Sequence, residues 1–464
     1  MNEIKKLNPN SAEARSIANH FQPYTNPSQL NESGPHIISS GEGIYVTDND
    51  GKQFIEGLSG LWCTSLGYSE NELLDAAVKQ MKKLPFYHSF TGKTVDPAID
   101  LSEKLVSIAP NNLDKVFFCN SGSEANDTAI KMVWYYQAAL GRPEKKKIIS
   151  RKRGYHGVTI GAASLTALPY AQQGFGLPLD FAKHTSSPHY FADSYPNETE
   201  QDFVNRIISE LEELINAEGP ETIGALIAEP VMGAGGVIPP PTGYFEALQK
   251  LLKKNSILMV ADEVICGFGR TGNMWGSNTY SIKPDILTCA KALSSSYLPI
   301  SAVLMSSEIV SGVEEQASKL GIFGHGYTYS ASPVPAAVAL RTIQLMEERN
   351  ILDHVRSISP TFLERVNKLG RFESVGDTRG VGLIGAMEFV AKPDTKEKMD
   401  PTQKFSIKAQ KIIQNHGVIL RSLPNDTIGF CPPLIISEKQ INEMFDRVES
   451  AMPEVDSLAA SLRK

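Results

Sequence analysis

The sequence predicts an α/β protein built on a largely parallel β-sheet, followed by a second, smaller α+β domain. Two observations lead to this class. Short segments rich in β-branched residues alternate along the chain with stretches of helical periodicity, and these segments are apolar throughout. Such strands are typical of parallel sheets that helices cover on both faces. The expected strands are 115–119, 146–150, 224–230, 256–263, 285–291 and 301–305.

The functional site is expected at one edge of this sheet, because ligands of open α/β sheets bind beyond the carboxyl ends of the strands. The residues that follow each strand are therefore the candidates for chemistry. The first 60 residues, which include a hairpin-like stretch over 43–57, could pack with either domain.

A turn of small residues follows the strand 115–119 and leads into a helix. One face of that helix is expected to be apolar and buried, with Ala125, Ala129, Met132, Val133 and Tyr136. The turn itself, Ser121-Gly122-Ser123, places free backbone N–H groups and two hydroxyls at the helix N-terminus. An anion such as a phosphate binds well there. Plain N-capping by serine is the alternative.

Basic residues gather around the next strand, in "RPEKKKIISRKRGYHG" (142–157). A nucleic-acid surface is one interpretation of such a cluster, and a solvated loop around a short strand is the other. We favour the solvated loop, because the net charge of the chain is −7 and no wider basic face accompanies the cluster.

The strand 256–263 ends with Asp262 and Glu263. A carboxylate on the inward face of a buried strand needs a cation or a strong hydrogen-bond donor as its partner. Asp262 is therefore a candidate site residue, and an ordinary turn residue or a structural ion pair is the alternative.

Lys291 ends the following strand, and it is the sole charged residue between Ile286 and Ser307. Burial lowers the pKa of a lysine and makes its amine a nucleophile, as Schiff-base chemistry requires. The alternative is a lysine whose amine reaches water along its apolar stem.

These three signals together match one cofactor, pyridoxal phosphate. It needs an anion site for its phosphate, a carboxylate for its ring nitrogen and a lysine for its aldehyde. The carboxylate of Asp262 would keep the ring nitrogen protonated, so that the ring can accept electrons. A covalent link between Lys291 and the cofactor would also avoid the free-energy cost of burying a charged ammonium group.

The chain has 464 residues, enough for two to four domains at about 100–200 residues each. A long helical stretch at 334–370 and short strands at 382–390 and 417–423 indicate the second domain. The five cysteines are widely spaced without any CxxC pair, which argues against disulfides and against a zinc site. No signal peptide or membrane span is apparent, so we expect a cytoplasmic protein that binds neither membrane nor nucleic acid.

Over essentially its whole length the sequence resembles the class III aminotransferases, and among them the ω-amino acid:pyruvate transaminases. The matching motifs include "NSGSEANDTAIK" (120–131), "RGYHG" (153–157), "AEPVMGAGGV" (228–237), "ADEVICGFGRTG" (261–272) and "CAKALSSSYLPI" (289–300). The resemblance implies fold type I of the pyridoxal-phosphate enzymes, with a seven-stranded sheet. It also implies an N-terminal segment (1–60) that packs with the small domain, a large domain (61–335) and a small domain (336–464).

The resemblance also assigns roles to residues of the cofactor site. Lys291 would bind the cofactor covalently and shuttle the substrate proton, and Asp262 would pair with the ring nitrogen. The remaining cofactor-binding residues would be Ser121, Gly122 and Ser123 at the phosphate, Tyr155 and Val264 on the two ring faces, Glu229, and Thr328 from the neighbouring subunit. A shared site of this kind implies a homodimer or a tetramer.

A substrate pocket is likewise implied, with Tyr24, Trp62, Phe90, Tyr155, Ala234, Ile265 and Arg421. In these transaminases an arginine at the place of Arg421 swings in to bind a carboxylate and swings out for a donor without one. From the residues alone, Arg421 would instead pair with Asp426 at the surface. Arg379 is a rival binder of the carboxylate.

Two departures from the family pattern stand out. Ornithine and 4-aminobutyrate aminotransferases carry a glutamate where this chain has Ala234, which favours the pyruvate-dependent ω-transaminases over those two. Ala292 replaces a glycine that many relatives have, and it should change local packing without affecting a catalytic role.

The expected reaction transfers an amino group from an ω-amino acid or amine, such as β-alanine, taurine, a diamine or an aryl amine, to pyruvate. The products would be an aldehyde or ketone and L-alanine. Two alternatives remain: a decarboxylase or aminomutase of the same fold, which needs no keto acid, and a cofactor-binding regulator without turnover. The short, non-basic N-terminus argues against the DNA-binding region that such a regulator needs.

Overall fold

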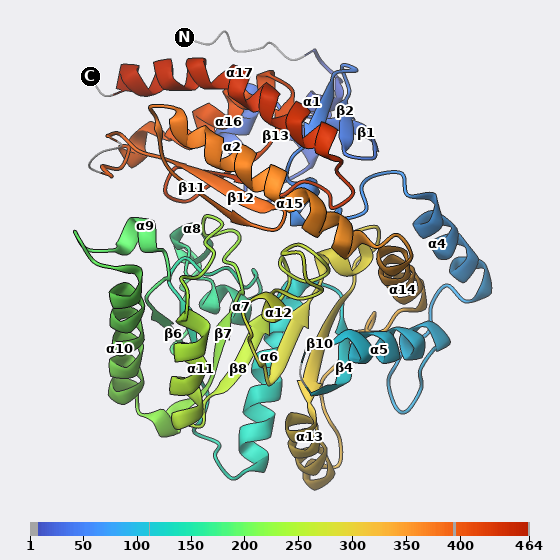
Figure 1. The fold of residues 1–464 in the computed structure, drawn as a ribbon. Coiled ribbons are helices and arrows are strands. Elements are labelled where there is room, and N and C mark those ends of the chain that lie inside the picture. The colour runs from blue at the N-terminus through green and yellow to red at the C-terminus, as the bar shows by residue number, and fades with distance from the viewer. Residues whose placement is uncertain (1–7, 111, 393–395, 463–464) are drawn as a thin grey trace.

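A computed structural model describes residues 8–110, 112–392 and 396–462, and three β-sheets with their covering helices make up this part of the chain (Figure 1). The largest sheet has seven strands in the order β4-β10-β9-β8-β7-β5-β6. These strands are β4 (Leu113–Cys119), β5 (Lys147–Arg151), β6 (Ala182–Thr185), β7 (Ile223–Ala228), β8 (Leu258–Asp262), β9 (Ile286–Cys289) and β10 (Ser301–Ser306).

Six of the seven strands point the same way. The pairs β6–β5, β5–β7, β7–β8 and β8–β9 are parallel, whereas β10 is antiparallel to both β9 and β4. The predicted α/β class with a mostly parallel sheet is therefore confirmed. The carboxyl ends of β4, β5, β7, β8 and β9 lie at one edge, as the prediction of the site requires.

Strand β6 is absent from the strands that the residues alone indicated. Its sequence, Ala-Lys-His-Thr, is short, and Lys183 and His184 are both partly exposed because β6 is an edge strand. An edge strand needs no continuous apolar run, so this signal was missing.

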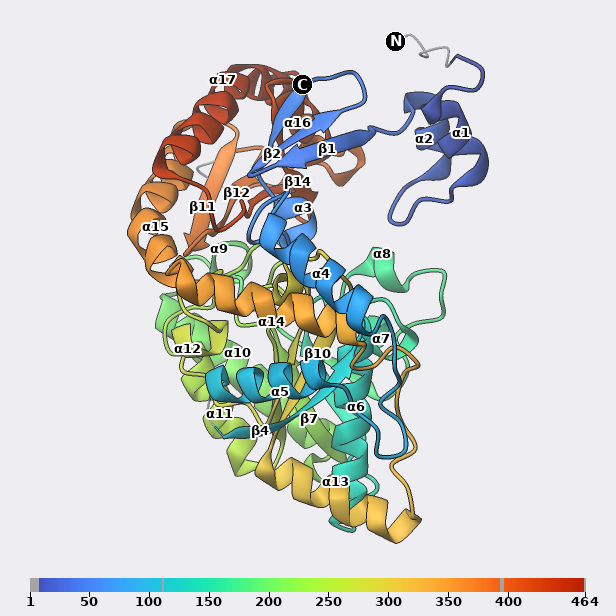
Figure 2. The ribbon, with the colours of Figure 1, turned by 90° about the vertical axis from the view of Figure 1, so that its right-hand side faces the viewer.

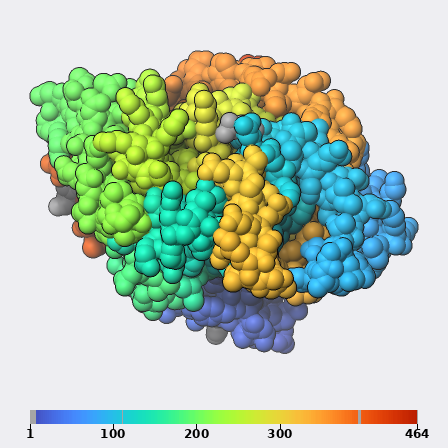
Figure 3. All heavy atoms as spheres, turned by 90° about the horizontal axis from the view of Figure 1, so that it is seen from below, coloured from blue at the N-terminus to red at the C-terminus, as the bar shows by residue number. Residues whose placement is uncertain are grey.

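Helices cover both faces of this sheet. On one face lies α6 (Gly122–Ala139), whose predicted apolar side is buried against inward residues such as Val260 and Val303. On the other face lie α10 (Glu200–Glu218), α11 (Tyr244–Lys254), α5 (Asp96–Ile108) and α14 (Pro333–Glu348). Seen from below, α13 (Ser307–Leu320) lies beside α6 (Figure 3).

Two four-stranded sheets carry the C-terminal part and join it to the N-terminal part. One has the order β11-β12-β15-β14, with β11 (Val375–Val381), β12 (Ile384–Phe389), β14 (Arg421–Leu423) and β15 (Thr427–Phe430). The other has the order β1-β2-β3-β13, with β1 (Ile38–Glu42), β2 (Tyr45–Asp48), β3 (Gln53–Glu56) and β13 (Val418–Ile419). The predicted hairpin over 43–57 is formed by β2 and β3.

The strand expected at 417–423 is divided between these two sheets. β13 pairs in parallel with β3, while β14 pairs antiparallel with β15. Leu420, between the two strands, is the point at which the chain passes from one sheet to the other.

The helical stretch expected at 334–370 is two helices, α14 and α15 (Ile351–Lys368). They are separated at Asn350, whose φ of 49° is left-handed and ends the first helix. The predicted domain boundary after residue 335 falls inside α14, and the division into domains stays a prediction.

The remaining long helices are α4 (Asn71–Lys83), α16 (Phe405–Asn415) and α17 (Glu438–Leu462). Strand β2 lies against α17, where Tyr45 donates a hydrogen bond of 2.9 Å to Glu443. Short helices complete the fold: α3 (Ser59–Trp62), α7 (Ile160–Leu165), α8 (Pro169–Gln172), α9 (Tyr190–Asp193) and α12 (Gly276–Thr279). Among the described residues, no helix is both long and apolar enough to cross a membrane.

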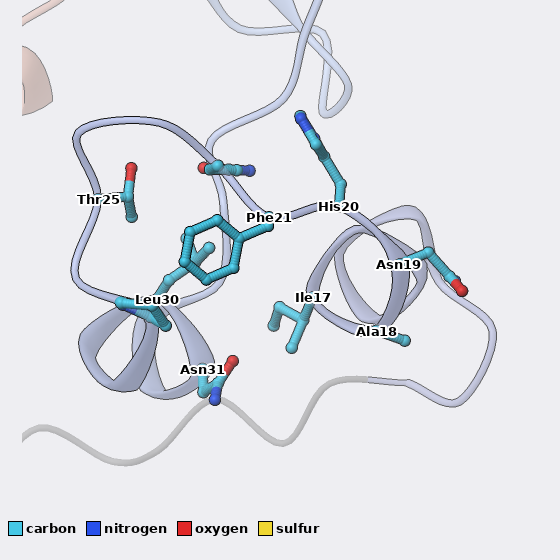
Figure 4. A pocket seen from close by; sticks show the side chains of 10 residues that line it. Ile17, Ala18, Asn19, His20, Phe21, Thr25, Leu30 and Asn31 are labelled. Carbon is cyan, nitrogen blue, oxygen red and sulfur yellow. The ribbon is translucent and has the colours of Figure 1, made fainter. Parts of the chain in front are cut away.

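The N-terminal helices α1 (Ala12–Asn19) and α2 (Pro27–Ser33) project from the body of the molecule (Figure 2). Neither helix has a buried residue, and Phe21 between them is 84% exposed. A small hollow lies between the two helices, with Ile17, Phe21 and Leu30 around it (Figure 4).

Candidate active site

Most of the predicted site residues line one cavity of about 550 Å³ beyond the carboxyl ends of the parallel strands. This volume is typical of small-molecule sites. The predicted residues in its lining are Tyr24, Trp62, Gly122, Ser123, Tyr155, Glu229, Ala234, Asp262, Val264, Ile265, Lys291 and Arg421.

Lys291 follows β9 and begins a short 3₁₀ helix, η2 (Lys291–Ser294). Its φ of 49° is left-handed, which is uncommon for a residue other than glycine and is often found at functional sites. No carboxylate of the described residues lies within 4 Å of its amine. Desolvation by burial lowers the pKa of Lys291 below that of an ordinary lysine. The amine is therefore suited to nucleophilic and proton-transfer chemistry.

Asp262, the last residue of β8, is held by three donors. Its Oδ2 accepts hydrogen bonds of 2.8 Å from both Asn126 Nδ2 and His156 Nδ1. Its Oδ1 accepts one of 3.1 Å from the backbone N–H of Val264. These donors stabilise a buried carboxylate and fix its orientation. Oδ1 keeps acceptor capacity for a group in the cavity.

The anion cradle is predicted at the turn before α6, where Ser121 has a different role from its neighbours. Ser121 caps the helix, and its Oγ accepts a hydrogen bond of 3.2 Å from the Glu124 N–H. Gly122 and Ser123 are the first residues of the helix, so their backbone N–H groups have no hydrogen-bond acceptor within the helix. Both residues also line the cavity. A Cβ on Gly122 would lie 3.1 Å from Val264, which explains why glycine stands there.

Trp62 closes one side of the cavity and is only 2% exposed. It packs in a cluster with Val231, Ile265 and Leu423. The segment before it has an irregular backbone, with left-handed φ at Ser59 and at Trp62 itself. Aromatic and apolar side chains thus surround the space next to Lys291, as an apolar amine donor requires.

Arg421 lies at the start of β14 and lines the same cavity. Its expected surface partner, Asp426, instead accepts a hydrogen bond from the Ser406 N–H at 2.9 Å. No carboxylate of the described residues lies within 4 Å of the Arg421 guanidinium. A guanidinium without a carboxylate partner beside an apolar pocket is an available binder for a substrate carboxylate.

The rival arginine, Arg379, already has its partners. It donates to the carbonyls of Gly236 and Val237 at 2.6 and 2.8 Å. Its guanidinium also lies 2.5 Å from Asp377 and 2.8 Å from Glu388. Arg379 therefore supports the loop that carries Ala234 and does not face a substrate.

Phe90 and Thr328 lie outside the cavity of this chain. Phe90 is 40% exposed, and its ring lies 2.6 Å from the position that a Cβ would take on Gly326. The loops that carry Phe90 and Thr328 are therefore adjacent to each other, and neither residue lines the cavity that contains Lys291. Their predicted roles stay predictions.

Asn126 and His156 are site residues that the sequence analysis did not identify. Both touch Asp262, and both belong to motifs that the resemblance had already marked, at 120–131 and 153–157. The signal was present, because a buried carboxylate needs donors and the polar side chains nearest in the fold supply them. Asn126 reaches Asp262 because α6 packs against the sheet, and His156 reaches it from the loop after β5, and no local pattern specifies either contact.

The cavity fits pyridoxal phosphate. Free N–H groups at the start of α6 suit the phosphate, and Asp262 Oδ1 suits the ring nitrogen. The Lys291 amine lies in the same cavity with a lowered pKa, as a covalent link to an aldehyde requires.

Comparison with known proteins gives the family. Residues 28–452 match the model of the family "Aminotransferase class-III". The chain is 47% identical to gamma-aminobutyrate transaminase 1, mitochondrial, of Oryza sativa subsp. japonica, over 98% of this chain and 88% of that protein. It is 45% identical to the ω-transaminase from Pseudomonas jessenii in complex with PMP, with a TM-score of 0.95 over 97% of this chain and 99% of that one.

A transaminase solved with L-Ala is 50% identical, with a TM-score of 0.89 over 91% of this chain and 99% of that one. These similarities extend over nearly the whole chain and agree with the chemistry of the cavity. The chain therefore belongs to the class III aminotransferases, as a pyridoxal-phosphate-dependent enzyme of the ω-transaminase type.

Proposed function

We propose that this enzyme transfers the amino group of an ω-amino acid or a simple amine to pyruvate, with L-alanine as the second product. The observation that carries this proposal is the guanidinium of Arg421, which lines the apolar cavity together with Lys291 and has no carboxylate partner among the described residues. One side of the site suits a carboxylate, and the aromatic side suits an apolar chain. A single pocket can therefore hold either pyruvate or a donor without an α-carboxylate.

The names of the relatives support this choice. The rice relative is a gamma-aminobutyrate transaminase, and one related structure contains L-Ala. Ala234 argues against those 4-aminobutyrate enzymes that carry a glutamate there, but it does not by itself exclude 4-aminobutyrate as a donor. We therefore add 4-aminobutyrate to β-alanine, taurine, diamines and aryl amines as donors to test.

The residues of the chain then have defined tasks. Bound pyridoxal phosphate supplies an electrophilic aldehyde and a ring that withdraws electrons from the substrate Cα. The Lys291 amine, with its lowered pKa, takes the Cα proton of the donor and returns a proton at C4′. Asp262 holds a proton at the ring nitrogen, and the N-terminus of α6 fixes the phosphate. Trp62 and Ile265 keep water from the reacting atoms.

Donor scanning with the purified enzyme tests the proposal. Each donor is incubated with pyruvate and, separately, without it, and both alanine and carbon dioxide are followed. We expect alanine in proportion to the donor consumed, and no turnover without a keto acid. Carbon dioxide release or steady turnover in the absence of pyruvate would instead identify a decarboxylase or aminomutase.

We also propose a homodimer with shared sites, or a tetramer built from such dimers. Support comes from Phe90 and Thr328, which lie together on loops outside the cavity of their own chain. A partner could place both at the site of the other subunit. We further propose a cytoplasmic location, which the five unpaired cysteines favour.

A further inference from the structure

A row of buried polar side chains lies next to Asp262, and two of its members, His156 and Glu229, also line the cavity. His156, Glu229 and Arg151 are 2%, 3% and 0% exposed. They come from the ends of neighbouring parallel strands, since Arg151 ends β5 and Glu229 follows β7. Buried polar groups of this kind are costly unless they are fully hydrogen-bonded.

The imidazole of His156 connects Asp262 to this row. Its Nδ1 lies 2.8 Å from Asp262 Oδ2, and because an ionised carboxylate only accepts, Nδ1 carries the hydrogen. The second nitrogen, Nε2, is buried and has no hydrogen-bond partner among the described residues. The ring therefore offers one further bond on the side opposite to Asp262.

Glu229 offers the matching group. Its Oε1 accepts a hydrogen bond of 3.3 Å from the Gly233 N–H, whereas its Oε2 is buried and has no hydrogen bond within the described part of the chain. A Cβ on Gly154 would lie 3.3 Å from His156 Nε2 and 3.7 Å from Glu229 Oε2. Both free atoms thus face the same small space, which the missing side chain of Gly154 leaves open.

Arg151 lies at the far end of the row. Its Nη2 donates a hydrogen bond of 2.6 Å to the Glu229 carbonyl and lies 3.7 Å from Glu229 Oε2. Burial raises the pKa of Glu229, while Arg151 and His156 act in the opposite direction. The charge state of Glu229 therefore depends directly on these two neighbours.

We propose that His156 and Glu229 share one proton, and that this pair, biased by Arg151, controls the charge beside Asp262. The inference rests on the proposed role of Asp262 at the ring nitrogen of the cofactor. In one state the Glu229 O–H donates to one water, and that water donates to His156 Nε2. In the other, that O–H bond is broken and an N–H bond is formed on Nε2, which leaves a carboxylate next to Arg151 and an imidazolium next to Asp262.

Other charged groups face this pair as well. Asp262 faces His156 from β8, and Lys291 lies in the same cavity as Asp262. His184 on β6 is a nearby imidazole, and its pKa is lowered by burial and, to a smaller extent, by the charge of His156. His184 is bonded instead to the Ser164 carbonyl at 3.1 Å. It therefore provides a matched control that is close to the row without belonging to it.

A spectroscopic titration of the holoenzyme tests the shared proton. The visible absorption band of the bound cofactor is followed against pH in wild type, Glu229→Gln, His156→Gln and His184→Gln. We expect the midpoint to move by about one pH unit in the first two variants, because each removes one member of the pair that shares the proton and so changes the charge beside Asp262. His184→Gln should titrate like wild type. An unchanged midpoint in Glu229→Gln would show that Glu229 is only structural.

Proton NMR of the apoprotein gives a second measurement that needs no turnover. A buried imidazole N–H bonded to a carboxylate gives a resonance downfield of the amide region. We expect His156→Gln to abolish this resonance, Glu229→Gln to shift it and His184→Gln to leave it in place. A resonance that Glu229→Gln does not shift would overturn the sharing. Because the apoprotein has no cofactor, this result is independent of whether the proposed donors and pyruvate are correct.

Discussion

At the scale of single residues, the site depends on two groups whose charges are set by burial. Lys291 and Asp262 could be predicted from the sequence, because a lone lysine and a strand-ending aspartate are unusual in apolar surroundings. The donors to Asp262 could not, because Asn126 and His156 reach it from different elements. Arg421 has no carboxylate partner within the described ranges, and this too follows from the fold, because the nearest acidic residue in the sequence, Asp426, accepts a hydrogen bond from Ser406 instead.

Replacing Arg421 tests its role as the carboxylate binder. For Arg421→Leu we expect the apparent affinity for pyruvate to fall about 30- to 150-fold, since a charge-assisted pair contributes roughly 2–3 kcal/mol. The half-reaction with an aryl amine should change by less than about threefold, because that donor has no carboxylate for the guanidinium to bind. Rapid mixing, with each half-reaction followed by absorbance, measures both.

Arg356→Leu is the control for that experiment, since Arg356 is exposed and pairs with Asp353 away from the cavity. Equal losses in the two half-reactions of Arg421→Leu would contradict the assignment, because they would indicate general damage to the pocket.

Replacing Glu56 tests the electrostatics of the segment that carries Trp62. Glu56 is buried and has no cationic partner in the part of the chain that the structure describes. Its Oε1 accepts a hydrogen bond of 3.0 Å from the Leu58 N–H, and burial raises its pKa to about 7. The folded state thus holds this proton more tightly than the unfolded state. The resulting stability is fully present below about pH 4.5 and is lost as the pH rises to about 7. The loss amounts to roughly 3 kcal/mol.

The variant Glu56→Gln has no charge to bury. We expect its free energy of unfolding, relative to wild type, to rise by roughly 3 kcal/mol between pH 5 and pH 8. Urea unfolding at the two pH values measures this change. Glu144→Gln, at an exposed position, serves as the control. A difference from wild type that is the same at both pH values would refute the argument.

At the scale of elements, the start of α6 shows how one turn divides two tasks between similar residues. Ser121 and Ser123 look alike in the sequence, and both were predicted at the phosphate. In the structure, Ser121 caps the helix, whereas Ser123 lines the cavity. The period of the helix predicted its buried face correctly, but the cap position depends on the residue at which the helix begins.

This division predicts different results for two matched substitutions. Ser121→Ala removes a cap and should lower the free energy of unfolding by about 1 kcal/mol without weakening cofactor binding. Ser123→Ala should weaken cofactor binding several-fold. Thermal unfolding of the apoprotein and titration with pyridoxal phosphate separate the two effects. Weaker cofactor binding in Ser121→Ala would contradict this division and would show that Ser121 also binds the phosphate.

At the scale of the whole molecule, the class of fold was predictable because parallel strands have a distinct pattern. The edge strand β6 and the division of residues 417–423 between two sheets were not. The intrinsic strand propensity of these segments does not determine either feature. Strand β6 forms by pairing along one side with β5, and β13 forms by pairing with β3, which is far away in the sequence. Contacts between distant segments determine where Arg421 lies.

Mixing two defective subunits tests whether the sites are shared. One subunit carries Lys291→Ala and the other carries Phe90→Ala with Thr328→Ala. In a mixed dimer, one site would combine an intact Lys291 with intact Phe90 and Thr328 from the partner. Statistical mixing should therefore restore about a quarter of the wild-type activity, because half of the dimers have one good site. Activity no higher than the average of the two separate variants would show that each chain builds its own site.

The parallel pair of β3 and β13 has a consequence for synthesis of the chain. Ile55 lies opposite Val418, so the N-terminal strands leave the ribosome long before their partner exists. Their edge stays unpaired while most of the protein is translated, and such edges favour aggregation. The last steps of folding therefore wait until Val418 and Ile419 have been synthesised, and a ribosome that stalls before that point releases a chain with an unpaired sheet edge.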